Sequence, residues 1–186
     1  VQEIAAAIDK ETRGQALIVG LSLGGYVAMA FAHRYPEKTK ALVLSGCSVN
    51  YPQCMTLAAK INSQLLINLY GERAFVRMLE LSFLWIFPRT TMTPVSGSFH
   101  PDAWGDAMLE IGSRNFSNQL RTFLGPVMIL NGENDTLNRS GERVFAAATR
   151  NGKLQIIRGA GHICNLDQPE IFNKAVQNFA RSLNPS

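Results

Sequence analysis

Long apolar runs, basic clusters and paired cysteines are all scarce in this sequence. The densest apolar patch, residues 83–87, is far shorter than the about 18 residues that cross a bilayer. The 18 basic and 14 acidic residues are scattered, with no run of consecutive Lys or Arg, so the net charge of +4 indicates a solvated surface. We therefore expect a protein that binds neither a membrane nor nucleic acid.

Only three cysteines are present, Cys47, Cys54 and Cys164, and they form neither a Cys-x-x-Cys pair nor a Cys/His ligand pattern. An odd number argues against a disulfide framework and favours a reducing compartment. No secretory signal segment is evident. The expectation is a cytoplasmic protein without a metal site.

Four short apolar runs predict buried strands, and the stretches around them predict helices. The strands are expected at residues 16–19, 41–44, 127–130 and 154–157, and the helices at 1–12, 23–34 and 169–183. Continuous apolar strands that alternate with helices are typical of a parallel sheet covered on both faces. The sequence therefore predicts an α/β fold.

Between the second and third predicted strands the chain makes a long helical excursion. Helices are expected at 53–70, 72–84, 102–111 and 114–123, and the Thr/Ser/Gly/Pro-rich stretch 88–101 is expected to be a loop. A plain crossover needs only about a dozen residues. We therefore expect a helical cap subdomain at residues 50–122, inserted into an α/β core made of residues 1–49 and 123–186.

The most informative motif is Gly20-Leu-Ser22-Leu-Gly24, between the first predicted strand and the next helix. Glycine has no Cβ, so Gly20 and Gly24 would allow a strained turn that presents Ser22 at the N-terminus of the helix. Backbone N–H groups there favour a developing negative charge. The alternative is a phosphate-binding turn, but no Gly-Lys-Ser/Thr follows and the spacing does not fit Gly-x-Gly-x-x-Gly.

A serine hydroxyl needs a base, and a third group to orient that base, before it becomes a nucleophile at neutral pH. Of the three histidines, His162 lies in a small-residue loop just past the fourth predicted strand, where it could reach Ser22. His33, beside Arg34 in a helix, and His100, in the cap loop, are expected at the surface.

The orienting acid has two candidates just after the third predicted strand, Glu133 and Asp135. Asp167 follows His162 too closely in sequence to be the usual acid, and it is expected to cap the last helix ahead of Pro169. The residues alone leave Glu133 and Asp135 open.

The order Ser22, Asp135, His162, each just beyond a predicted parallel strand, resembles the α/β-hydrolase superfamily. Its members carry Gly-x-x-Asp after the penultimate strand, matched by Gly132 to Asp135, and Gly-His after the last strand, matched by Gly161-His162. The resemblance favours Asp135 as the acid. A serine nucleophile is typical of its esterase, lactonase and C–C hydrolase groups, whereas its dehalogenase and epoxide-hydrolase branches use Asp at this position.

The resemblance implies a serine hydrolase that cleaves a small apolar or aromatic ester-like substrate through an acyl-enzyme. Ser22 would be the nucleophile, His162 the general base, Asp135 the group that orients it, and the Leu23 N–H an oxyanion donor. No metal or organic cofactor would be needed, and the partner would be a small-molecule substrate. The bond cleaved (ester, lactone, thioester, amide or C–C) and the oligomeric state are left open.

Apolar residues of the cap, together with one residue beside the base, are the candidates for a substrate pocket. They are Met78, Phe83, Trp85, Phe87, Phe99, Trp104 and Ile163. The alternative for each of them is ordinary packing within the cap.

Members of this superfamily typically have eight strands, whereas this sequence supplies four. The first residue is Val1, so we expect the chain to be an internal piece of a longer protein, which supplies the C-terminal part of the fold and lacks the N-terminal half of the sheet. The front half would carry a second oxyanion donor, and without it the strand at 16–19 would expose an apolar edge. Two alternatives to an active hydrolase therefore stay open: a ligand-binding member of the same fold, and an inactive fragment.

Overall fold

The computed structural model of the protein describes residues 1–87 and 100–183. Its centre is a four-stranded sheet in the order β1-β2-β3-β4, in which every neighbouring pair is parallel. The strands are β1 (Ala16–Leu21), β2 (Thr39–Ser45), β3 (Val127–Gly132) and β4 (Gly152–Ile157). Each strand contains its predicted apolar run, so the predicted α/β fold with a parallel sheet is confirmed. The prediction that all four strands are buried was wrong for β4, where residues 152–155 are exposed because this strand forms the other edge of the described sheet.

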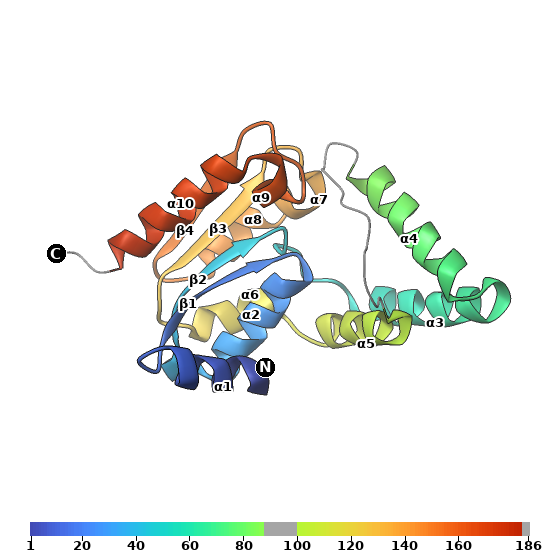
Figure 1. The fold of residues 1–186 in the computed structure, drawn as a ribbon, viewed down its shortest axis with the longest axis horizontal. Helices are drawn as coiled ribbons and strands as arrows, with labels where there is room; N and C mark the ends of the chain where they lie inside the picture. The colour runs from blue at the N-terminus through green and yellow to red at the C-terminus, as the bar shows by residue number, and fades with distance from the viewer. Residues whose placement is uncertain (88–99, 184–186) are drawn as a thin grey trace.

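Helices cover both faces of this sheet (Figure 1). They are α1 (Gln2–Glu11), α2 (Leu23–Arg34), α3 (Gln53–Tyr70), α4 (Glu72–Ile86), α5 (Pro101–Gly112), α6 (Phe116–Thr122), α7 (Thr136–Arg139), α8 (Glu142–Ala147), α9 (Cys164–Asp167) and α10 (Pro169–Ser182), with a 3₁₀ turn η1 at Pro36–Lys38. Residues of α2, α6 and α8 pack on one face, against Leu42 and Ile129. Residues of α9 and α10 pack on the other face, against Val43 and Leu130. Because successive side chains of a strand point to opposite faces, burial on both faces explains why β2 and β3 are apolar along most of their length.

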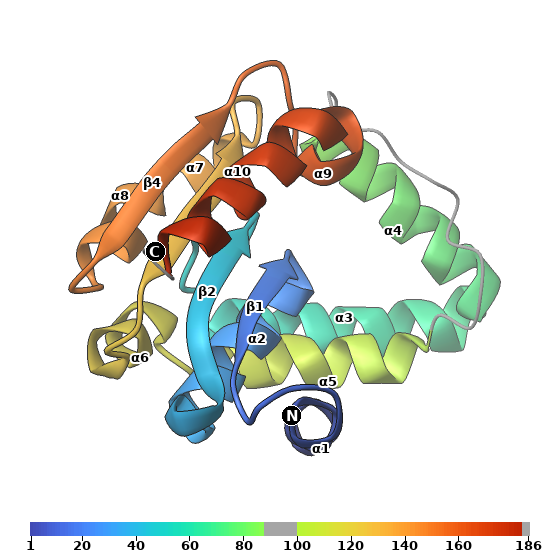
Figure 2. The ribbon, with the colours of Figure 1, turned by 60° about the vertical axis from the view of Figure 1, so that its left-hand side comes forward.

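The excursion between β2 and β3 contains α3, α4, α5 and α6. In Figure 1 the first three lie to the right of the sheet, on the side toward which the strands point, and Figure 2 shows them in a second view. Helix α5 approaches α3 closely, since a Cβ on Gly112 would lie 1.8 Å from Thr56 Oγ1. In contrast, α6 packs into the core, where Phe116 and Leu120 join Tyr26 of α2. The helices α3, α4 and α5 thus lie on the side of the sheet where the strands end and where Ser22 follows β1.

The observed helices differ from the predicted ones mainly at their ends. Helix α4 continues to Ile86, two residues past its predicted end. The helices α7, α8 and α9 and the turn η1 were not predicted, because segments of three to six residues are too short to show helical periodicity. Most of the predicted loop at 88–101 lies outside the described residues, and Pro101 begins α5.

Strand β1 forms an edge of the sheet in the described part of the chain. It pairs there with β2 alone, and Val19 on it is 45% exposed. Among the helices that the structure describes, none combines the length and the apolar character that crossing a membrane requires.

Candidate active site

Ser22 occupies a strained turn between β1 and α2. Its φ of 52° and ψ of −123° lie in a region that side-chain-bearing residues rarely adopt, and it is the N-cap of α2. The turn is held by two backbone hydrogen bonds. Ser22 N–H donates to Ser45 O at 2.8 Å, and Gly25 N–H donates to Ser22 O at 2.9 Å. Strain held in place by its surroundings is typical of functional positions.

Of the two glycines that the sequence predicted to be obligatory in this turn, the structure requires one. A Cβ on Gly20 would lie 2.5 Å from Gly24 O, so Gly20 must lack a side chain, as predicted. The prediction for Gly24 was wrong, because a Cβ there would meet nothing within 4 Å. The second obligatory glycine is Gly25, whose Cβ would lie 2.2 Å from Cys47 Sγ. Gly25 therefore lets α2 start against the segment that follows β2.

The structure brings Ser22, His162 and Asp135 into one hydrogen-bonded chain. His162 Nε2 lies 3.0 Å from Ser22 Oγ, and His162 Nδ1 lies 2.8 Å from Asp135 Oδ2. His162 is 3% exposed and Asp135 is fully buried. An ionised carboxylate can only accept a hydrogen bond, so Nδ1 carries the proton and Nε2 is left to accept from the serine hydroxyl.

The other candidate acid, Glu133, supports the histidine loop from outside. Its carboxylate accepts a hydrogen bond from Gly159 N–H at 3.0 Å, and its backbone O accepts one from Arg139. Of the two alternatives that the sequence left open, Asp135 is the one bonded to His162.

Asp167 has a different partner from the one predicted. The N-cap of α10 is Gln168, without a side-chain cap, so the prediction that Asp167 caps this helix was wrong. Its Oδ2 instead accepts a hydrogen bond from Gly161 N–H at 2.7 Å. The acid that follows His162 in sequence therefore braces the loop that carries His162.

Two aromatic rings of α4 and its C-terminal end pack against His162. The Phe87 ring is stacked on the imidazole, with centroids 4.1 Å apart and an interplanar angle of 14°. The Phe83 ring meets it edge-on at 5.5 Å. Gly46, at the end of β2, also lies against the base, since a Cβ on it would be 2.8 Å from His162 Cε1. The C-terminal end of α4 thus contacts the base directly.

The remaining predicted pocket residues lie in varied places. Ile163, next to the base, is half-buried. Trp104 packs edge-on against Phe75, with ring centroids 6.0 Å apart, and Trp85 is 84% exposed. Met78 is 41% exposed, and Phe99 lies outside the described residues. His33 and His100 are exposed, as the sequence predicted.

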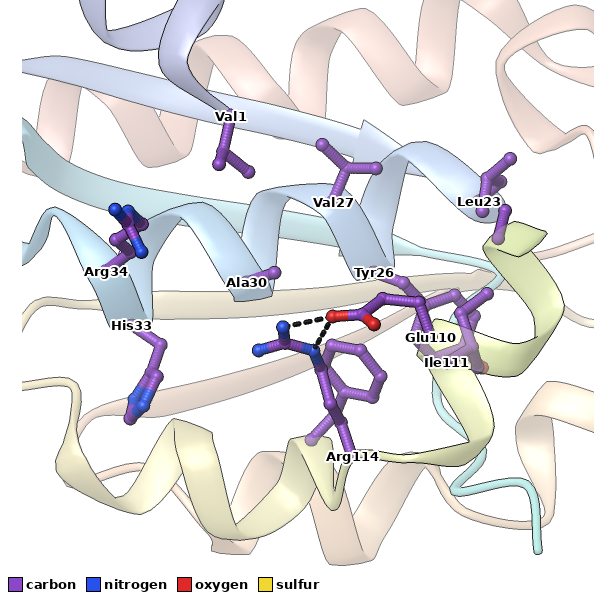
Figure 3. A pocket seen from close by; sticks show the side chains of 12 residues that line it. Val1, Leu23, Tyr26, Val27, Ala30, His33, Arg34, Glu110, Ile111 and Arg114 are labelled. Atoms are coloured by element: carbon purple, nitrogen blue, oxygen red, sulfur yellow. Dashed lines mark hydrogen bonds and ion pairs between the residues drawn. The ribbon is translucent and has the colours of Figure 1, made fainter. Parts of the chain in front are cut away.

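A cavity of about 500 Å³ lies along the outer surface of α2, where α5 faces it (Figure 3). Its lining includes Leu23, Val27 and Ile111, with the ion pair of Arg114 and Glu110 across from α2. Neither Ser22, Asp135 nor His162 lines it. Because only Leu23 links the two places, we do not assign this cavity to the substrate.

The three cysteines, Cys47, Cys54 and Cys164, are all free in the structure. Burial raises the pKa of the Cys47 and Cys164 thiols above its usual value, so both stay protonated and are poor nucleophiles. Cys54 is exposed. Within residues 1–87 and 100–183, no group of three or more His, Cys, Asp or Glu residues could hold a metal ion.

Two buried asparagines behind the site were not predicted from the sequence. Asn138 bonds to Asp135, and Asn131 bonds to Gly46 N–H at 2.9 Å. Asn138 lies three residues after Asp135, the spacing of an N-cap and its first-turn partner, which is the one local signal that could have indicated it.

These features define a class of protein: a parallel α/β sheet with a serine at a strained strand-to-helix turn and a histidine–carboxylate pair on later loops. A model of the alpha/beta hydrolase family matches residues 1–175. The chain therefore belongs to this family, as its motifs predicted.

Relatives by sequence include named hydrolases. The 2-(acetamidomethylene)succinate hydrolase of Mesorhizobium japonicum is 27% identical over 195 residues, which cover 95% of this chain and 68% of that protein. A 2-hydroxy-6-oxononadienedioate/2-hydroxy-6-oxononatrienedioate hydrolase of Klebsiella pneumoniae is 24% identical, over 95% of this chain and 66% of that protein. These relatives support a hydrolase activity in general terms.

Solved structures show the same fold. MenH from S. aureus superposes with a TM-score of 0.79 at 20% identity, over 98% of this chain and 74% of that one. A thermophilic esterase from Thermogutta terrifontis gives 0.76 at 21% identity, over 97% and 70%. At these identities the similarity concerns the fold alone.

Proposed function

We propose that the protein is a serine hydrolase in which Ser22 is the nucleophile, His162 the general base and Asp135 its orienting acid. The observation that carries this proposal is the continuous chain of contacts, 3.0 Å from Ser22 to His162 and 2.8 Å from His162 to Asp135. The chain starts at the one described non-glycine residue with a positive φ. A nucleophile, a base within hydrogen-bond reach and a third group that orients the base form the arrangement that activates a serine.

The reaction follows from these contacts. Ser22 Oγ attacks the carbonyl carbon of the substrate while His162 Nε2 takes its proton, and Asp135 stabilises the imidazolium that forms. The Leu23 N–H, in the first turn of α2, is a donor for the oxyanion. The imidazolium then protonates the leaving group, and water attacks the acyl-enzyme with His162 again as base.

The substrate class that we propose is a small molecule with an apolar or aromatic ester-like group. The buried Phe87 and the half-buried Phe83 beside the base would contact such a group, since aromatic side chains are typical of the walls of ligand sites. A second candidate is a 2-hydroxy-6-oxo dicarboxylate, because the Klebsiella pneumoniae relative is named for one. We propose the cytoplasm as the compartment, because Cys54 is an exposed free thiol.

The test is the intact mass of the protein after incubation with a fluorophosphonate probe. The expected result is a single adduct that Ser22→Ala abolishes. Ser140→Ala is the matched control, because Ser140 is exposed and its hydroxyl bonds only to the backbone O of Leu137 among the contacts seen here. A wild-type protein without an adduct would point to the alternatives, a ligand-binding protein or an inactive fragment. Burst kinetics with p-nitrophenyl acetate and with a 2-hydroxy-6-oxo dicarboxylate then separate the two substrate candidates.

A further inference from the structure

Asn138, in the short helix α7, holds the carboxylate of Asp135 at both oxygens. Its Nδ2 lies 3.0 Å from Oδ1 and 3.0 Å from Oδ2 of Asp135. Its backbone N–H is a further donor, 3.4 Å from Oδ1. Asn138 is 1% exposed, so these contacts are shielded from water. The same Nδ2 lies 3.4 Å from His162 Nδ1, so the Asn138 amide contacts both members of the His162–Asp135 pair.

The other end of the same amide is bound to the segment after β2. Asn138 Oδ1 accepts a hydrogen bond from Ser48 N–H at 3.0 Å. A reversed amide would direct its carbonyl oxygen at a carboxylate and its NH₂ group at an N–H, so only one orientation satisfies both ends. The side chain thus links the Asp135 loop rigidly to the end of a neighbouring strand.

A second buried amide extends this link toward the base. Asn131 accepts from Gly46 N–H at 2.9 Å, and its Nδ2 lies 3.4 Å from Ser48 Oγ and 3.3 Å from Glu142 Oε2. Gly46 contacts the His162 ring. The segment of residues 46–48 is therefore fixed at both ends, and Asn138 is fixed to it.

We propose that Asn138 is a positioning residue for the His162–Asp135 pair. Its amide donates to the Asp135 carboxylate, places Asp135 Oδ2 opposite His162 Nδ1, and so keeps the imidazole aimed at Ser22. The consequence for activity rests on the proposed function, whereas the effect on the His162–Asp135 hydrogen bond does not. Asn138 itself touches no reacting atom.

The first measurement concerns this hydrogen bond. Protein labelled with ¹⁵N-histidine carries His33→Gln and His100→Gln, so that His162 is the single histidine left. The Nδ1–H proton of His162 should give a resonance protected from exchange with water. Asn138→Ala should make that exchange at least about tenfold faster or broaden the signal beyond detection. Asn50→Ala is the matched control, because Asn50 also clamps a helix start, accepting from Phe116 N–H at 2.9 Å, but lies outside this network.

The second measurement is the burst of p-nitrophenyl acetate hydrolysis, with the burst amplitude counting the folded, active molecules. Displacement of a catalytic group by about 1 Å costs on the order of 10²-fold in rate, so Asn138→Ala should lower the acylation rate constant by about that factor. KM should stay within about twofold, because a buried residue behind the acid binds no substrate. Asn138→Asp, of nearly equal volume but without the NH₂ donor, should show the same loss. Asn50→Ala should reduce stability alone.

The proposal is overturned by a wild-type His162 without a protected Nδ1–H proton, or by an Asn138→Ala protein that exchanges this proton as slowly as Asn50→Ala does. A protein that shows the predicted exchange difference but no wild-type burst would refute the proposed function and leave the positioning role standing. Should Asn138→Ala not fold, Asn138→Asp is judged by the same two measurements.

Discussion

Replacement of Gly46 by alanine tests the geometry around the base with a single added carbon atom. Gly46 has a φ of +60°, and a Cβ on it would lie 2.8 Å from His162 Cε1 and 3.0 Å from Nδ1. Carbon atoms normally approach to about 3.5 Å, so the ring would have to move by about 0.7 Å. It has little freedom to do so, because Nδ1 is bonded to the buried Asp135 and Phe87 is stacked on the ring.

Two costs follow from this substitution, and they can be separated. A side chain at positive φ destabilises the fold by roughly 1–2 kcal/mol wherever it occurs. Displacement of the base should in addition slow acylation of Ser22 by on the order of 10²-fold. Gly14→Ala is the matched control, since Gly14 has a φ of +90° and a Cβ there would meet nothing within 4 Å. Gly14→Ala should therefore lose stability because of its positive φ without displacing the base.

The assay is the rate constant and amplitude of the p-nitrophenyl acetate burst, together with urea denaturation of both variants. Both should lose similar stability, and only Gly46→Ala should lose rate per active molecule. Equal acylation rate constants in the two variants would refute the reasoning, because the contact between residue 46 and the imidazole would then have no effect on the base.

Three further outcomes are expected. Gly25→Ala should be strongly destabilised in urea, because its Cβ would lie 2.2 Å from Cys47 Sγ, whereas Gly24→Ala should fold with near wild-type stability; the opposite ranking would contradict the assignment of the obligatory glycine. Phe87→Ala should expose the imidazole that this ring covers and change KM for aromatic esters relative to aliphatic ones, and equal effects on both would argue against an aromatic wall beside the base. Burial raises the pKa of the Cys47 thiol above its usual 9.0, so the folded state keeps a proton that the unfolded chain loses above that pH. The stability that the buried, protonated Cys47 thiol contributes is present below about pH 9 and is lost as the pH rises, by up to about 1.4 kcal/mol per pH unit. The free energy of unfolding should therefore fall more steeply between about pH 9 and 11 in wild type than in Cys47→Ala. Parallel curves for the two proteins would show that Cys47 makes no such contribution.

Local sequence pattern was sufficient to predict the order of strands and helices and to single out Ser22 and His162. Strands β2 and β3 are buried on both faces and are therefore apolar along most of their length, so they were visible as short runs such as 41–44. The turn at Ser22 was visible because strain at a strand-to-helix junction requires glycine nearby. The loop that carries His162 was visible because it directly follows a predicted strand.

The positions of the aromatic residues around α4 explain why only some of those predicted to line the site lie beside the base. Phe83 and Phe87 are four residues apart and share a helix face, whereas Trp85 between them points elsewhere and is 84% exposed. The predicted helix ended at residue 84, so the prediction did not place Phe83 and Phe87 on the same face of one helix. In the structure α4 ends at Ile86, so Phe87 directly follows the helix and lies with Phe83 against His162.

The sequence by itself determined the α/β architecture and the family, and it indicated Ser22 and His162, because each leaves a local trace in strand, turn or loop chemistry. For the acid it left Glu133 and Asp135 open until the family resemblance favoured Asp135. Only the tertiary structure decided which groups meet: Ser22 and His162 are 140 residues apart in the chain and 3.0 Å apart in space. It also decided that Gly25 rather than Gly24 must lack a side chain, that Asp167 braces the histidine loop, and that Asn138 clamps the acid. These choices depend on which strands are neighbours and in what register, and no single segment of the chain contains that information.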